Sequence, residues 1–312
     1  MYDKIFSKCN SKIVRVIVSI LALFILFQMI DIGNTFSAFS KINLAFVPLV
    51  FLLIIGSIGI YVLNYFVFLR RLSFLKGSTL SRSFREYIYI WSIGLFLPGK
   101  IGELGVIPLL KHKHKVPYKF GSLAVGLPKV MMVIVLLCVV FLFGIGLEQF
   151  NEWILLTGII ALILCVLFVI IWFFRKDFIL QFKICAGLYD SRKELLFFVK
   201  PRQIIELILV TVIRFLLVVF SFILLFLAFG FAPSFFVIAF TVALSQVISF
   251  VPISLNGLGI REASFTGALI IFGVSSATAV SVVLISLALN YGFAIIIILM
   301  NLLKNNISLR KH

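Results

Sequence analysis

The chain has 312 residues, of which 63% are hydrophobic and only 12% charged, and its mean hydropathy is +1.25. No water-soluble domain can bury so large an apolar fraction, so the composition indicates a polytopic membrane protein and excludes a soluble catalytic module. The formal net charge of +17 would suit a nucleic-acid-binding protein. However, the basic residues stand in short loops between apolar runs, where they signal membrane orientation, so no nucleic-acid partner is expected.

Several apolar runs are long enough to cross a hydrocarbon core of about 30 Å as helices that rise about 1.5 Å per residue. The first run follows a basic stretch but has no convincing small-residue cleavage site, so we expect a retained span instead of a cleaved signal peptide. We therefore predict an all-α polytopic fold in which residues 1–312 form a single integral membrane domain. The six predicted full spans are Ile13–Ile30, Leu44–Leu69, Gly121–Leu147, Trp153–Phe174, Ile204–Gly230 and Ala279–Leu303.

Two further apolar intervals are interrupted in the middle. Tyr87–Leu110 is broken at "PGKIGE", and Phe235–Gly273 is broken at "VPISLNGLGIRE". Proline ends an incoming helix and glycine permits a tight turn, so both intervals predict broken helical hairpins. The arms of the first hairpin are about 15 Å long, half a bilayer, and predict a re-entrant hairpin; the second is either re-entrant or two near-full spans. The hairpin-break residues are Pro98, Gly99, Gly102, Pro252, Gly257 and Gly259.

The Lys and Arg residues set the predicted orientation. With two hairpins that leave the topology unchanged, 23 of the 28 basic residues fall in cytoplasmic segments, and both termini are cytoplasmic. Two spans, a broken hairpin and one span then form each half of the chain, approximately 1–150 and 151–312, in opposite orientations. Such an inverted repeat with discontinuous helices is typical of transporters.

A few charged residues lie within the membrane segments or at their breaks. By helical rise, Lys129 lies about 12 Å and Arg214 about 15 Å along its predicted span. Charges at this depth are costly and tend to face cavities or partners, although Lys129 could extend to the cytoplasm and Arg214 could face cavity water. The cations outnumber the carboxylates, which suggests an anionic ligand such as a phosphate head group. The set comprises Lys100, Lys129, Arg214, Arg261, Glu103 and Glu262.

Motifs for other chemistry are missing from the sequence. The "KHKHK" stretch reads as a solvated loop, because flanking cations oppose a metal ion, and no catalytic Ser-His-Asp, Cys-His or HExxH pattern occurs. No nucleotide-binding phosphate loop occurs either, so we expect no cofactor and no metal. Glu103 and Glu262 stand near Lys100 and Arg261, which favours ionised, paired carboxylates over a catalytic acid. A transporter is therefore preferred to an enzyme.

At the two breaks the chain resembles the lysylphosphatidylglycerol synthase/flippase membrane-region family. The stretches "FLPGKIGELG" (Phe96–Gly105) and "VPISLNGLGIRE" (Val251–Glu262) are similar to the two signature stretches of that family, and the span order is similar over nearly the whole chain. The chain lacks the family's arginine after the first motif, where Val106–Pro108 stand, and a common acidic–Arg motif reads "PKVMM" here. The matching residues are Pro98, Gly99, Gly102, Glu103, Pro252, Asn256, Gly257, Gly259, Arg261 and Glu262.

The resemblance implies a flippase-like domain that moves aminoacylated phospholipids or lipid-linked glycans between the leaflets of a prokaryotic cytoplasmic membrane. The family's soluble aminoacyl-transfer domain is not found in the sequence, so we do not expect this chain alone to aminoacylate lipid. We expect an inner-membrane protein that translocates an anionic lipid of phospholipid or polyprenyl-phosphate type. Arg261 would hold the phosphate, and the carboxylates would orient the cations or couple protons. The expected substrate-binding residues are Arg261, Glu262, Asn256, Lys100, Glu103, Lys129 and Arg214.

Three alternatives remain open at the level of sequence. The chain could be a membrane partner or scaffold of a cell-envelope glycosyltransferase or lipid-modifying transferase, an intramembrane transferase, or a channel or ion carrier. The expected partners are membrane lipids, cell-envelope biosynthesis enzymes and a second copy of the chain.

Overall fold

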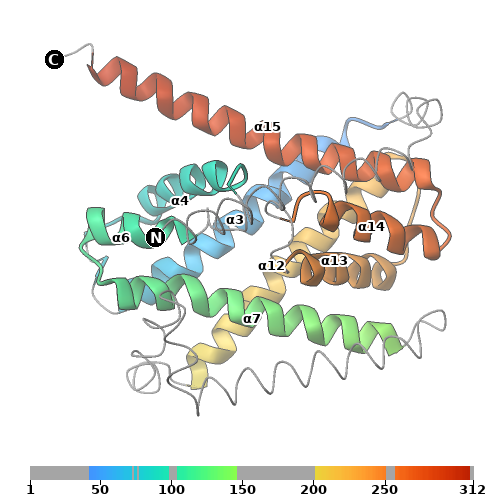
Figure 1. Ribbon diagram of the computed structural model, residues 1–312, viewed down its shortest axis with the longest axis horizontal. Coiled ribbons are helices and arrows are strands. Elements are labelled where there is room, and N and C mark those ends of the chain that lie inside the picture. The colour runs from blue at the N-terminus through green and yellow to red at the C-terminus, as the bar shows by residue number, and fades with distance from the viewer. Residues whose placement is uncertain are drawn as a thin grey trace, which may run out of the picture. The chain divides into compact units, whose positions relative to one another are not determined.

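The computed structural model describes residues 42–71, 74–75, 77–97, 104–145, 201–250 and 257–309. Within these ranges the chain forms eight helices and no strand (Figure 1). The helices are α3 (Phe46–Arg71), α4 (Leu80–Gly94), α6 (Val106–His114), α7 (Tyr118–Ile145), α12 (Pro201–Ala228), α13 (Phe235–Ser249), α14 (Ile260–Ile271) and α15 (Ser276–Leu309).

Four of these helices, α3, α7, α12 and α15, are long and apolar enough to cross a membrane. They confirm four of the six predicted spans, with boundaries that differ from the predicted ones by a few residues. The other two predicted spans, Ile13–Ile30 and Trp153–Phe174, lie outside the described residues. The chain is thus an all-helical, multi-pass membrane protein.

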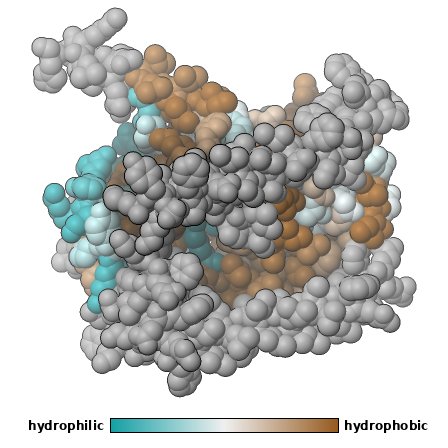
Figure 2. Space-filling model, in the orientation of Figure 1, coloured by the Kyte–Doolittle hydropathy of each residue, from teal (hydrophilic) through white to brown (hydrophobic). Residues whose placement is uncertain are grey.

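The long helices expose their apolar side chains instead of burying them. Only 22–33% of the most apolar window of each candidate span is buried inside the protein. On α15, Ile296, Leu299 and Met300 are each more than half exposed, and Figure 2 shows apolar side chains along the visible part of this helix. Burial inside the protein therefore does not explain this apolar surface, and lipid tails cover such surfaces at no cost.

The described residues divide into two compact units. Unit 1 comprises those within Met1–Gly56, Arg85–Glu103 and Leu217–His312, and unit 2 comprises those within Ser57–Phe84 and Leu104–Leu216. Helices α3, α4 and α12 each contribute residues to both units. The inverted halves 1–150 and 151–312 stay a prediction.

In unit 1, the second interrupted interval is a pair of short packed helices. α13 and α14 pack against each other, and α14 also packs against α15. With 15 and 12 residues, α13 and α14 are about 22 and 18 Å long, which is less than the roughly 30 Å of a hydrocarbon core. Ser245 and Ser249 are buried on α13, and each donates its hydroxyl to a carbonyl of the preceding turn. Because these side chains are small and their hydroxyls are hydrogen-bonded within α13, they permit close packing of the helices.

The turn before α14 depends on two glycines with a left-handed backbone. Gly257 has φ +80° and Gly259 has φ +83°, a region that other residues rarely adopt. A Cβ on Gly257 would lie 2.7 Å from the Cβ of Ser249 at the end of α13. Gly257 thus brings the turn against α13, as predicted for a broken helix at this place.

The first interrupted interval is also broken near the predicted position. Among the described elements, α4 ends at Gly94 and α6 begins at Val106. The predicted break residues, Pro98, Gly99 and Gly102, lie outside the described residues. A re-entrant hairpin at this place therefore stays a prediction.

In unit 2, α6 packs against α7 (Figure 1). The chain reverses after α6 at Lys115, whose φ of 56° is left-handed and whose N–H donates to the carbonyl of Leu110. A Cβ on Gly121 of α7 would lie 3.4 Å from Ile107 of α6, which is a close helix contact. The polar end of α6, at Lys111–Lys113, is exposed and forms part of the hydrophilic surface in Figure 2.

Gly257→Ala tests the turn. A left-handed backbone costs a non-glycine residue about 1–2 kcal/mol, and the clash with Ser249 adds to this cost, so we expect a lower unfolding temperature in detergent. Gly267→Ala is the matched control, because Gly267 lies inside α14 with open space around it. Alanine there should be neutral or stabilising by up to about 1 kcal/mol. Equal unfolding temperatures for the two variants would contradict the prediction.

Candidate functional site

The predicted site residues fall into three groups. Gly257, Gly259, Arg261 and Glu262 lie together in unit 1, at the start of α14. Lys129 and Arg214 lie in unit 2, on α7 and α12. The remaining residues, Pro98, Gly99, Lys100, Gly102, Glu103, Pro252 and Asn256, lie outside the described residues.

Glu262 stabilises the first turn of α14. Its side chain is almost fully buried, and one carboxylate oxygen, Oε2, accepts a hydrogen bond of 2.7 Å from the N–H of Gly259. The N–H groups at a helix start have no partner within the helix, and leaving one unpaired in apolar surroundings costs several kcal/mol. The helix dipole also favours a negative charge in this position. Glu262 therefore stabilises the break itself.

The other oxygen of the same carboxylate holds Arg261. Oε1 of Glu262 accepts hydrogen bonds from Nε and Nη2 of Arg261 at 2.9 and 2.5 Å. The Arg261 side chain is 42% exposed, whereas that of Glu262 is 2% exposed. The guanidinium is thus oriented by its buried neighbour, and its accessible face can still donate to another group. Its charge is largely offset by Glu262.

Tyr291 of α15 connects this turn with the end of α4 inside unit 1. Its hydroxyl donates a long hydrogen bond of 3.5 Å to the carbonyl of Leu95, and its ring lies edge-on to Phe96 with 5.5 Å between centroids. Tyr291 is also close enough to interact electrostatically with Arg261 and Glu262. The residues that follow α4 and those that begin α14 therefore share one neighbour.

In unit 2, a buried tyrosine of α3 bonds to α7 beside the proline inside that helix. Pro128 has no N–H, so the carbonyl of Ala124, four residues earlier, loses its helical partner. Beside this gap, the hydroxyl of Tyr61 on α3 donates a hydrogen bond of 3.2 Å to the carbonyl of Val125. Neighbouring helices commonly supply such bonds around a membrane proline. Tyr61 is 2% exposed, so its ring is fixed against α7.

The guanidinium of Arg214 lies over the fixed ring of Tyr61. The central carbon of the guanidinium lies 4.7 Å from the ring centroid. Among the described carboxylates, Glu206 pairs with Arg71 and Glu262 with Arg261, and none of the described carboxylates forms an ion pair with Arg214. A cation–π contact contributes about 0.5–2 kcal/mol, whereas an arginine at the centre of a span costs about 2.5–3.5 kcal/mol on insertion scales. The ring therefore offsets only part of the cost of this charge.

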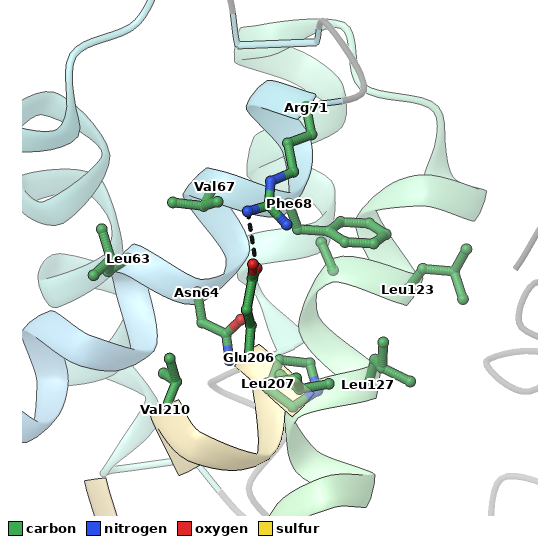
Figure 3. A pocket seen from close by; sticks show the side chains of 12 residues that line it. Leu63, Asn64, Val67, Phe68, Arg71, Leu123, Leu127, Glu206, Leu207 and Val210 are labelled. Atoms are coloured by element: carbon green, nitrogen blue, oxygen red, sulfur yellow. Dashed lines mark hydrogen bonds and ion pairs between the residues drawn. The ribbon is translucent and has the colours of Figure 1, made fainter. Parts of the chain in front are cut away.

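A pocket lies between α3, α7 and α12 in unit 2, with a volume of about 130 Å³ (Figure 3). Apolar side chains from all three helices form most of its wall, and Asn64 adds a polar group. At one end, Nη2 of Arg71 lies 2.8 Å from Oε2 of Glu206. Both side chains are more than one third exposed, so this ion pair contributes about 0–1 kcal/mol.

Sequence reasoning missed four residues of these arrangements: Tyr61, Tyr291, Arg71 and Glu206. Arg71 was treated only as an orientation signal, and Glu206 is separated from it by 135 positions. Tyr61 and Tyr291 each stand in an apolar run, where a tyrosine is a signal of a needed hydrogen bond at depth. The described residues contain no group of three or more His, Cys, Asp or Glu side chains that could hold a metal ion.

The described fold and charges define a class of protein: a polytopic helical membrane protein with two short helices joined at a glycine turn and an arginine, Arg214, within a candidate span. The family model for the lysylphosphatidylglycerol synthase TM region matches residues 12–298, which is most of the chain. The chain belongs to this family, as its two signature stretches predicted. No curated protein and no solved structure matches the chain.

Glu262→Gln tests the role of the buried carboxylate. A glutamine offers one acceptor oxygen and no charge, so it cannot hold both Arg261 and the N–H of Gly259. We expect faster hydrogen exchange at the start of α14 and a lower unfolding temperature. Ser264→Ala is the control, because that hydroxyl only donates to the carbonyl of Arg261 in the same helix. Unchanged exchange in Glu262→Gln would show that the carboxylate does not stabilise the turn.

Substitutions of Tyr61 separate its two contacts. Tyr61→Phe removes the hydroxyl and should cost about 1 kcal/mol, the usual value for one hydrogen bond. Tyr61→Leu also removes the ring beneath Arg214 and should cost about 1–2 kcal/mol more. The measurement is unfolding in detergent, monitored at equal protein and detergent concentrations. Equal losses in the two variants would mean that the ring does not stabilise Arg214.

Proposed function

We propose that the protein translocates an anionic lipid, or a lipid-linked glycan intermediate, between the leaflets of the cytoplasmic membrane. The cargo would be of phospholipid or polyprenyl-phosphate type, and the phosphate would be the group that the protein binds. Both termini would be cytoplasmic, and the halves 1–150 and 151–312 would form an inverted repeat of three spans and a broken hairpin each. Membership of the lysylphosphatidylglycerol synthase TM-region family supports a role with membrane lipids.

Arg214 is the observation that carries this proposal. It lies within the candidate span Ile205–Ala228, half-buried, with a ring beneath it and no described carboxylate beside it. A charge kept at such a position at a net cost indicates a ligand of opposite charge. A phosphate group supplies that charge, and arginine binds phosphate through two parallel hydrogen bonds.

Arg261 and Glu262 would act as a second binding point. Glu262 fixes the guanidinium of Arg261 at the start of a half-length helix, where backbone N–H groups also favour an anion. The exposed part of Arg261 would then hold phosphate while Glu262 keeps the arginine in place. Lys100, Glu103, Lys129 and Asn256 would assist in binding, as the sequence predicts.

The test is lipid movement in vesicles that contain the purified full chain. Fluorescent phosphatidylglycerol or a fluorescent polyprenyl phosphate is added to both leaflets, and the fraction exposed outside is measured by quenching. Wild type should make nearly all of the label accessible, whereas Arg214→Gln should slow the movement about tenfold, as expected when about 1.4 kcal/mol of binding is lost. Arg261→Ala should slow it as well. Lys113→Gln, an exposed charge at the end of α6, is the control.

Each outcome has a definite meaning. Wild-type vesicles that behave like protein-free vesicles would overturn translocation and favour a scaffold for a cell-envelope enzyme. Ion leakage without lipid movement would favour a channel. Normal movement in Arg214→Gln would remove Arg214 from the binding machinery.

A further inference from the structure

We propose that the pocket between α3, α7 and α12 binds the phosphate-bearing head group of a membrane lipid, with Arg214 beyond its inner end and the Arg71–Glu206 pair at its outer end. This inference rests on the proposed function, because it assigns the cytoplasmic-leaflet binding site of the same cargo. It uses residues of unit 2 only.

The alignment of α3 with α12 places the Arg71–Glu206 pair, the pocket and Arg214 one after another along the two helices. Arg71 contacts Glu206, and Tyr61 contacts Arg214, so the two helices run antiparallel along the pocket. Glu206 and Val210 line the pocket, and Arg214 follows one helical turn later on the same face of α12. The ion pair and the arginine on the ring are thus about 12 Å apart along α12. The pocket occupies the interval between them.

The volume of the pocket and the positive charge near it fit a phosphate head group. A volume of about 130 Å³ is roughly ten times what one water molecule requires, which is enough for a phosphate with a small substituent. The pair of Arg71 and Glu206 is neutral as a whole, and Arg214, which forms no ion pair with a described carboxylate, adds a positive charge near the pocket. Because the ion pair is exposed and weakly held, a phosphate oxygen can also recruit Arg71.

The surroundings favour a lipid over free phosphate. The wall of the pocket is apolar, with Val67, Leu127 and Val210 facing it from the three helices (Figure 3). Leu209 and Ile213, on the neighbouring face of α12, are 56% and 49% exposed and offer an apolar surface to acyl chains. A lipid keeps its chains on such a surface while its head group enters the pocket. Free phosphate would have to leave water for apolar walls.

The experiment fills the pocket without changing its charge. The full chain is reconstituted in nanodiscs of equal parts phosphatidylglycerol and phosphatidylcholine, and retained lipids are identified by native mass spectrometry. Val210→Phe should lower retained phosphatidylglycerol about tenfold, equivalent to about 1.4 kcal/mol of binding. Arg214→Gln, which leaves the pocket open, should lower it similarly. Leu142→Phe is the matched control, because it adds the same ring at an exposed position of α7 that lies 14 residues beyond Pro128 and does not line the pocket.

Three results would overturn the pocket assignment. Wild-type retention in Val210→Phe, given a normal gel-filtration profile, would show that lipid binds elsewhere. An equal loss in Leu142→Phe would show that the effect does not come from the pocket. Displacement of the lipid by inorganic phosphate at equal concentration would make free phosphate the occupant.

Lipid movement measured in the same variants separates this inference from the proposed function. If wild type moves lipid, and Val210→Phe both moves and retains it normally, the pocket assignment fails and translocation stands. If Val210→Phe loses retention but wild type moves no lipid, the pocket stands as a lipid site and translocation fails.

Discussion

Polar groups inside the membrane must find partners within the protein, because lipid offers none, and this requirement shapes both units of the structure. The clearest example is the carboxylate of Glu262, which satisfies the start of α14 with one oxygen and Arg261 with the other. Without such a carboxylate, the start of α14 would leave an N–H group unpaired beside an unbalanced arginine. The break and its charge are stabilised by the same side chain.

The same requirement produces a chain of consequences in unit 2. Pro128 interrupts the hydrogen bonds of α7, and the hydroxyl of Tyr61 reaches the neighbouring carbonyl. This bond fixes the ring of Tyr61, and the fixed ring receives the guanidinium of Arg214. A single tyrosine of α3 thus contacts both α7 beside its proline and the charge on α12.

The sequence predicts the parts of this structure that depend on local composition. Hydropathy and length give α3, α7, α12 and α15, because a helix in lipid needs only an apolar run of sufficient length. Proline and glycine mark the break before α14, because the left-handed turn at Gly257 and Gly259 requires glycine.

Pairing between distant helices is not encoded in local composition, and here the prediction falls short. Nothing near Arg71 in the sequence indicates Glu206, and nothing near Tyr61 indicates Arg214. Sequence reasoning gave Arg261 the main role in binding phosphate, whereas the structure shows its guanidinium already engaged by Glu262. Arg214 looked less informative in the sequence because its environment is created by α3 and α7.

The length of the four spanning helices has a consequence for the membrane around them. Their apolar segments have 24–28 residues, or about 36–42 Å, against a hydrocarbon core of about 30 Å. Such helices tilt, or thicken the surrounding bilayer, to avoid exposing apolar surface to water. A thicker bilayer would allow α3 and α12 to stand more upright, and a thinner one would incline them further. The thickness of the bilayer therefore affects the space between α3 and α12, whether or not a ligand is bound.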